Sequence, residues 1–93
     1  MILSFSCKET HKVSLGQYSK KWNTDIRRIA MRRLDYLDAA INLDDLRIPP
    51  SNRLHPLKDN LLGFYSISIN MKWRIIFVWK HGNAHDVKIT DYH

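Results

Sequence analysis

The 93-residue sequence contains a single cysteine, Cys7, so no intrachain disulfide can form and nothing requires an oxidising compartment. Its three glycines are too few for a Gly-rich phosphate-binding loop. The longest uninterrupted apolar run, residues 75–79, is far shorter than the ~18 residues that suggest a membrane span. No basic segment precedes the short apolar run at the N-terminus, as it would in a secretory signal. We therefore expect a soluble cytoplasmic protein with no membrane association.

Metal-ligand patterns are also missing. The acidic residues are scattered, and no pair or triad has the spacing of a magnesium site. No group of His and Cys residues matches zinc-ligand spacing. Cys7 has no chemical partner nearby and is expected to be a small buried thiol. We predict that the protein uses no metal and no cofactor.

The charge is strongly positive. Fifteen Lys and Arg residues against nine Asp and Glu give a net charge of +6. On a chain of this length, such an excess attracts polyanions and speeds their encounter with the protein. Nucleic acid is therefore one candidate partner, and the position of the charges in the fold must decide.

Residues 24–41 form the clearest predicted element, an amphipathic helix. Its apolar residues recur at steps of three and four, as a helix packed on a core requires. They are Ile26, Ile29, Ala30, Leu34, Leu37, Ala40 and Ile41. Asn23 or Thr24 can cap the start, and Asp25 suits the positive end of the helix dipole. Four arginines fall away from the apolar stripe and would give the helix a basic outer face: Arg27, Arg28, Arg32 and Arg33.

The remaining segments predict an α+β domain. Residues 2–5 indicate a short N-terminal strand, and Gly16 suits the end of a short helix. Residues 42–46 suggest one more helical turn, closed by Pro49 and Pro50, and residues 51–60 are irregular. No repeat, low-complexity tract or linker interrupts the chain, so we expect a single domain over residues 1–93.

From Phe64 onward the apolar residues alternate with a period of two. Two alternating runs flank a turn at residues 70–72, which predicts an antiparallel hairpin, and a second turn at residues 81–83 leads to a last strand. The result is a three-stranded antiparallel meander with the helices on one face. If Trp73, Ile75, Phe77 and Trp79 meet the helices, Arg74 must point to the opposite face unless a bulge intervenes.

Two segments carry side chains suited to chemistry. One is residues 53–58, in which His55 and Lys58 stand three apart on a segment fixed by Pro56. The other is the C-terminal Asp91, Tyr92 and His93, where the terminal carboxylate should favour the imidazolium form of the last ring. Taken singly, each has an ordinary explanation: an exposed loop histidine and a frayed polar tail.

Together with Arg74, these residues fit RNA cleavage. The ribose 2′-OH can attack its own phosphate, so the enzyme supplies only a base, an acid and cations. Imidazole can serve as base or acid near neutral pH. Arg74 and Lys58 would hold the phosphate, while Tyr92 would stack on a base or hydrogen-bond a phosphate.

The ordered set of segments resembles a known family. Asn-Arg-Leu-His-Pro-Leu-Lys, then Gly-Phe-Tyr-Ser-Ile-Ser-Ile-Asn, then Trp-Arg-Ile-Ile-Phe and a final Asp-Tyr-His are similar to the HigB, or plasmid-maintenance killer, branch of the RelE toxins. The N-terminal Met-Ile-x-Ser-Phe also resembles that branch. Residues 59–62 depart slightly, since relatives are often more polar there.

The resemblance implies a microbial-RNase-like fold, with an N-terminal strand and helices on one face of a twisted antiparallel sheet. It implies a type II toxin that cleaves mRNA in the ribosomal A site and is neutralised by a HigA-type helix-turn-helix antitoxin. The positions that match the family are His55, Lys58, Arg74, Asp91, Tyr92 and His93. His55 with Asp91 or His93 would transfer protons, and which residue is acid and which is base stays open.

A non-catalytic RNA- or DNA-binding module is the alternative. The four arginines of the long helix could clamp phosphates unaided, while aromatic sheet residues stack on bases. In a third interpretation, which is compatible with the toxin, the same helix docks a protein partner and catalysis lies elsewhere. In the toxin interpretation, its basic face would meet ribosomal RNA.

Overall fold

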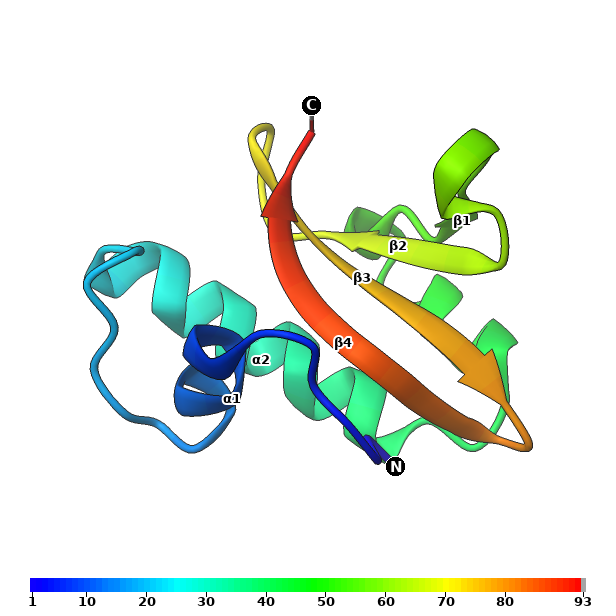
Figure 1. Ribbon diagram of the computed structural model, residues 1–93, viewed down its shortest axis with the longest axis horizontal. Helices are drawn as coiled ribbons and strands as arrows, with labels where there is room; N and C mark the ends of the chain where they lie inside the picture. Colours follow the sequence, from blue (N-terminus) through cyan, green and yellow to red (C-terminus); the bar gives the residue numbers. More distant parts are fainter. Residues whose placement is uncertain (93) are drawn as a thin grey trace.

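The computed structural model describes residues 1–92 and consists of two α-helices, three short 3₁₀ turns and a four-stranded antiparallel sheet. The order along the chain is α1 (Lys8–Ser14), α2 (Thr24–Ala39), η1 (Leu43–Arg47), η2 (Pro50–Asn52), β1 (His55–Pro56), η3 (Asp59–Leu61), β2 (Phe64–Ser68), β3 (Trp73–Lys80) and β4 (Asn83–Asp91). The strands lie side by side in chain order (Figure 1). Among residues 1–92, no helix is long and apolar enough to cross a membrane.

The long helix forms where the apolar periodicity predicts it. Asn23 caps its start, because the side-chain oxygen of Asn23 accepts a hydrogen bond from the Ile26 N–H at 2.9 Å. The helix ends at Ala39, two residues earlier than predicted, because Ala40 takes an extended conformation. Ile41 therefore leaves the apolar stripe and is 77% exposed.

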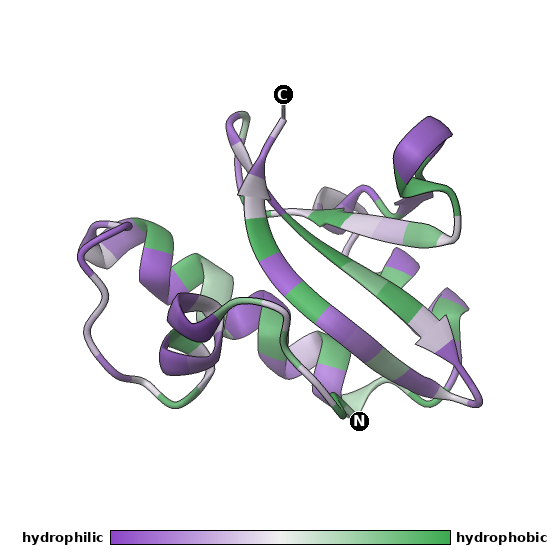
Figure 2. Cartoon of the chain, in the orientation of Figure 1, coloured by the Kyte–Doolittle hydropathy of each residue, from purple (hydrophilic) through white to green (hydrophobic). Residues whose placement is uncertain are grey.

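The core lies between α2 and one face of the sheet. Figure 1 shows α2 running behind the sheet, with α1 beside β4. From α2, Ala30, Leu34 and Leu37 are buried, and the sheet contributes a matching apolar set. Its main members are Ile67, Ile75, Phe77, Val87 and Ile89. Figure 2 shows the alternation along β4, where polar and apolar residues follow one another.

Two parts of the sheet differ from the sequence prediction. The N-terminal segment forms only two isolated parallel bridges to β4, Ile2 with Ala84 and Phe5 with Val87, rather than a strand. β1 was not predicted, and it adds a fourth strand to the meander. A strand of two residues is too short to leave a periodic signal in a sequence.

A β-bulge interrupts the pairing of β3 with β4. Val78 pairs with His85 and Ile76 with Lys88, so β4 advances one residue more than β3 between these pairs. Asp86 lies in this stretch with a positive φ of 54°. The extra residue allows Ala84 and Val87, three positions apart, to be buried in the same core.

Candidate active site

The strand register decides which side chains share the face of the sheet directed away from α2, here called the far face. Residues paired across antiparallel strands point to the same side. One row across the sheet consists of Ser68, Arg74 and Thr90. The next row consists of His55, Ser66, Ile76 and Lys88. Pairing of β1 with β2 thus brings His55 into the row beside that of Arg74.

Parts of the far face are closed to solvent. Ser66, Ser68 and Ile76 are buried, whereas Thr90 is half-buried and Lys88 is exposed. Arg74 points to this side as strand alternation predicts, but it is half-buried rather than fully exposed. The accessible part of the face therefore lies around Arg74 and β4.

Arg74 is a cation without an anionic partner in the described part of the chain. None of the ion pairs formed within residues 1–92 involves it, and its Nε is buried with no hydrogen-bond partner there. Its guanidinium carbon lies 5.0 Å from the centre of the Tyr92 ring. Stacking on the ring fixes the plane of the guanidinium while leaving its donors unused. Such an arginine is suited to bind an anion.

The His55 ring is oriented by its own segment. Its Nδ1 lies 2.9 Å from the carbonyl oxygen of Arg53. A carbonyl oxygen only accepts hydrogen bonds, so Nδ1 carries the hydrogen and Nε2 is left for proton transfer. Arg53 adopts a left-handed conformation, with φ 50° and ψ 49°, which turns the chain from η2 into β1. His55 is exposed.

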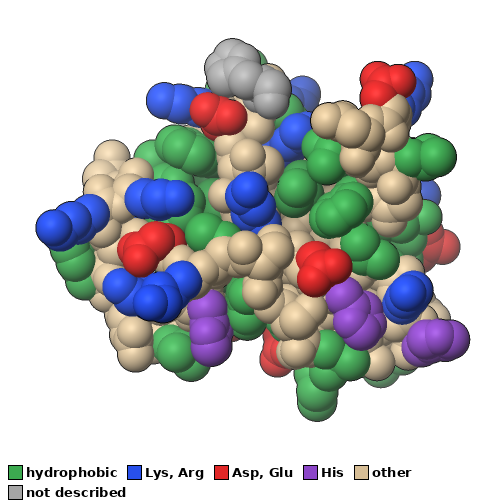
Figure 3. Space-filling model, in the orientation of Figure 1, with side chains coloured by type: hydrophobic (Ala, Val, Ile, Leu, Met, Phe, Trp, Pro, Cys, Tyr) green, Lys and Arg blue, Asp and Glu red, His purple; other side chains and the backbone are tan. Residues whose placement is uncertain are grey.

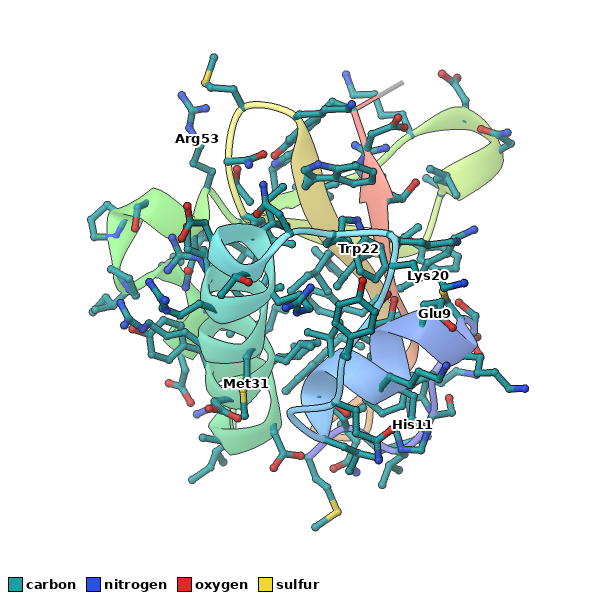
Figure 4. All side chains as sticks on the ribbon, turned by 90° about the vertical axis from the view of Figure 1, so that its left-hand side faces the viewer. Glu9, His11, Lys20, Trp22, Met31 and Arg53 are labelled. Carbon is teal, nitrogen blue, oxygen red and sulfur yellow. The ribbon has the colours of Figure 1, made fainter. Side chains whose placement is uncertain are left out.

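An open hollow of about 270 Å³ lies beside these residues and is lined by Arg53, His55, Asn70, Met71 and Tyr92. Figure 4 shows Arg53 extending beside the β2–β3 turn, which carries Asn70 and Met71. The Asn70 side chain shapes this turn by accepting hydrogen bonds from the backbone N–H groups of Lys72 and Trp73, at 2.9 and 2.7 Å. The hollow joins one predicted segment, around His55, to part of the other, Tyr92.

The sequence did not single out Arg53, Asn70 or Met71. Residues 70–72 were recognised as a turn, but only the pairing of β1 with β2 places that turn beside His55. Arg53 had a weak signal, its position next to the Leu-His-Pro segment. The position of the turn beside His55 depends on the pairing of two separate segments, which the sequence alone does not reveal.

Two other predicted site residues, Asp91 and Lys58, do not line this hollow. Asp91 pairs with Trp73, whose side chain packs against the core, and it lines a different hollow together with Lys21 and Trp22. Lys58 is exposed and lies just before η3. His93 lies outside the described residues. Within the described residues, His, Cys, Asp and Glu form no group of three or more suited to a metal ion.

The predicted basic face of α2 is partly consumed by internal contacts. Arg27 donates hydrogen bonds to the carbonyl oxygens of Ser19 and Trp22. Arg33 donates to the carbonyl oxygen of Ser68 at 3.0 Å and to the Ser51 hydroxyl at 3.3 Å. Two arginines remain exposed: Arg28, which lies 3.8 Å from Asp25, and Arg32.

Comparison with known proteins identifies proteins named HigB as relatives of this chain. The chain is 46% identical over 61 residues to Toxin HigB-1 of Vibrio cholerae, covering 66% of the chain and 64% of that protein. It is 36% identical over 61 residues to the Endoribonuclease HigB of Proteus vulgaris, covering 66% of the chain and 65% of that protein. The matched part thus spans slightly less than two thirds of the length of each relative.

The fold is shared with a solved structure. The YoeB-YefM complex from Staphylococcus aureus contains a chain that superposes with a TM-score of 0.64 and 18% sequence identity, covering 100% of this chain and 98% of that one. The predicted RelE-like α+β fold is thereby confirmed. The family described as RelE-like toxin of type II toxin-antitoxin system HigB matches residues 11–93. The chain therefore belongs to the HigB-like toxins.

Proposed function

We propose that this toxin is an endoribonuclease that cleaves mRNA by acid–base chemistry using the ribose 2′-OH, without a metal. The observation that carries the proposal is Arg74, a half-buried cation that is stacked on Tyr92, unpaired within the described residues and in the row next to His55. A phosphate suits such an arginine, because the guanidinium fork matches two phosphate oxygens. The Proteus relative is named as an endoribonuclease.

The reaction needs one proton removed and one supplied. A base takes the proton of the 2′-OH, the 2′-oxygen bonds to phosphorus, and the bond from phosphorus to the 5′-oxygen breaks. An acid protonates the departing 5′-oxygen, leaving a 2′,3′-cyclic phosphate and a free 5′-OH. His55 Nε2 takes one of these two roles, because Nδ1 is engaged by the Arg53 carbonyl. His93 is our candidate for the other role, because Asp91 lines a different hollow from His55.

The remaining residues act on charge and orientation. Arg74 stabilises the negative charge that grows on the phosphorane oxygens, and Lys58 adds a second positive charge. Tyr92 lines the same hollow as His55, and its ring lies against the Arg74 guanidinium. Tyr92 therefore orients this cation and offers a surface on which a base can stack.

The shape of the site supports dependence on the ribosome. The hollow is open, and His55 is exposed, so this hollow by itself restrains the nucleotide to be cleaved poorly. Cleavage of this kind depends on holding the 2′-OH, phosphorus and leaving oxygen in line. We propose that the ribosomal A site supplies this alignment in the cytoplasm. As a type II toxin, the protein would be neutralised by a HigA-type helix-turn-helix antitoxin.

The test compares two histidine variants. His55→Asn removes the proposed acid–base group, whereas His81→Asn removes an exposed imidazole at the β3–β4 turn; asparagine tolerates the φ of 52° at this turn. We expect His55→Asn to slow cleavage of a translated reporter mRNA by about 10²–10⁴-fold and to relieve growth arrest. His81→Asn should retain both activities.

Equal cleavage by His55→Asn and the unsubstituted protein would disprove the acid–base role. A non-catalytic binding module, the alternative function, would behave differently: the unsubstituted chain would bind RNA, and neither it nor any variant would cut the reporter.

A further inference from the structure

The outer edge of β4 changes character along its length. Its first half is covered by the N-terminal segment through the bridges at Ala84 and Val87. Beyond Val87, the Ile89 N–H donates to the hydroxyl of Thr10 at 2.9 Å, and Thr10 is fully buried. A side chain therefore occupies a donor that an added strand would need, which protects this edge against pairing with another chain. The half of the edge beyond Val87 is therefore suited to a ligand other than a β-strand.

One hollow lies beside this half of β4, and a second hollow shares Lys21 with it. One, of about 340 Å³, lies between the edge and the α1–α2 connection; its lining includes Lys21, Trp22, Trp73, Lys88, Thr90 and Asp91. The other, of about 420 Å³, is lined by Glu9, Lys12, Tyr18, Lys20 and Lys21. We call this pair of hollows the β4-edge track. Figure 4 shows the α1–α2 connection, with Lys20 and Trp22, passing beside the sheet.

The track carries an excess of available positive charge. Lys20, Lys21 and Lys88 are exposed, and none of them takes part in the ion pairs formed within residues 1–92. Figure 3 shows lysine and arginine side chains gathering over the α1–α2 region and reaching β4, with apolar side chains between them.

The acidic residues of the track do not cancel this charge. Glu9 is held by the Ser19 hydroxyl at 2.8 Å and by Lys12 at 3.2 Å, so it neutralises Lys12 rather than the other lysines. The hydrogen bond from Ser19, followed by that from Lys12, lowers the pKa of Glu9, which therefore stays ionised at neutral pH. Asp91 is a second carboxylate, at the end of the track nearest Arg74.

Aromatic rings alternate with these cations. Tyr18 is 69% exposed, and the Arg27 guanidinium lies 4.9 Å from its ring centre, which restrains the ring without covering it. Trp73 is half-buried and packs edge-on against Trp22, and the Lys72 ammonium lies 5.2 Å from the Trp73 ring centre. Cations that follow a backbone, interleaved with aromatic rings on which bases stack, are typical of surfaces for single-stranded nucleic acid.

The track is continuous with the proposed active site. Thr90 pairs with Arg74 across the sheet, and Lys88 lies on the same far face one row further. Both residues also line the track. An RNA bound at Arg74 therefore reaches the track by crossing only β4, which lies one β-strand spacing of ~4.8 Å away.

We propose that single-stranded RNA continues from Arg74 over the edge of β4 onto the track, with its phosphates on Lys88, Lys21 and Lys20 and a base on Tyr18. The choice of RNA rests on the proposed function. An acidic peptide is the competing occupant. RNA is favoured because the track combines one exposed ring, Tyr18, with several exposed lysines, and because the edge is closed to a peptide strand.

The test measures binding of an oligouridylate to the full chain in a His55→Asn background, which prevents cleavage. Lys20→Gln/Lys21→Gln is compared with Lys80→Gln, an exposed lysine at the end of β3 that lies outside the track. Each lost phosphate contact should reduce the magnitude of the slope of log K against log salt concentration by about 0.7. The slope of the double variant should therefore be smaller in magnitude by about 1.4, and the slope of the control should be unchanged. Lys88→Gln should lose about 0.7 in the same assay.

Stacking is tested separately by Tyr18→Ala, which should weaken oligouridylate binding about tenfold without changing the salt slope. Polyglutamate serves as the acidic-peptide probe. Salt slopes equal to that of Lys80→Gln would overturn the proposal, as would track variants that lose polyglutamate binding while keeping that of RNA. If the chain binds RNA through the track but never cuts mRNA, the proposed endoribonuclease function is wrong and the proposed RNA-binding track is still supported.

Discussion

The outer face of α2 and the far face of the sheet both carry arginine, but the two regions use it differently. On α2, Arg27 and Arg33 donate hydrogen bonds to backbone carbonyl oxygens of neighbouring segments. On the sheet, Arg74 has a buried Nε without a partner among residues 1–92 and only an aromatic ring against its plane. The helix has more arginines, yet the sheet has the one prepared for a ligand.

The difference follows from what surrounds each guanidinium. Residues 19–22 and the end of β2 expose carbonyl oxygens that no regular ladder reaches, and a long arginine from α2 satisfies them. At Arg74, near the start of β3, the strand is already paired with β2 and β4. Arg74 therefore finds no carbonyl to bind. The number of charges in a sequence does not reveal how many remain available.

The largest expected effect concerns Arg74. Arg74→Met keeps an apolar stem of similar length and removes the cation, so cleavage of translated mRNA should fall by about 100-fold or more. Because no ion pair within residues 1–92 is lost, the melting temperature should shift by no more than about 4 °C. Lys80→Met is the matched loss of one charge and should leave cleavage unchanged. A large fall in melting temperature would make Arg74 a structural residue.

A smaller effect, of the opposite kind, is expected at Arg27. Arg27→Met leaves the carbonyl oxygens of Ser19 and Trp22 without their donor, which should lower the free energy of unfolding by about 1–3 kcal/mol. Urea unfolding followed by circular dichroism measures this change. Arg28→Met, which removes only an exposed contact to Asp25, should change stability by less than about 0.5 kcal/mol. If the two variants were equally stable, Arg27 would be a free surface cation after all.

The smallest effect tests the same idea with a carboxylate. Asp45 accepts hydrogen bonds from the Asn42 and Ile41 N–H groups, both at 3.0 Å, and these bonds lower its pKa, that from Asn42 most. A carboxyl group whose pKa is lower in the folded state stabilises the protein at pH values above its unfolded-state pKa. This stabilisation is lost as the pH falls through the folded-state pKa. Asp45→Asn should therefore be less stable than the unsubstituted protein near neutrality. The difference in unfolding midpoint should shrink below about pH 4 and would be constant if Asp45 made no such bonds.

Much of the fold could be predicted from periodicity. The three- and four-residue spacing located α2, and the two-residue alternation located β2, β3 and β4. Features set by contacts between distant segments could not be predicted. Examples are β1, which exists only by pairing with β2, and the reduction of the N-terminal strand to two bridges.

The candidate site likewise has parts that could be predicted from the sequence and parts that could not. Strand alternation placed Arg74 on the far face, and His55 and Tyr92 line one hollow as a shared site requires. Asp91 was grouped with Tyr92 because they are adjacent in the chain, but its register beside Trp73 directs it to another hollow. Adjacent residues of an extended strand point to opposite sides, so neighbours in sequence rarely share a strand-face site.

The bulge in β4 gives the strand two phases that are set independently. On one side of Asp86, alternation serves packing under the N-terminal segment; on the other, it places Lys88 and Thr90 beside Arg74. Removing one residue there would turn one half of the strand inside out relative to the other. A substitution in either half therefore changes one position, whereas a gain or loss of a single residue at this point would exchange core and ligand-facing positions together.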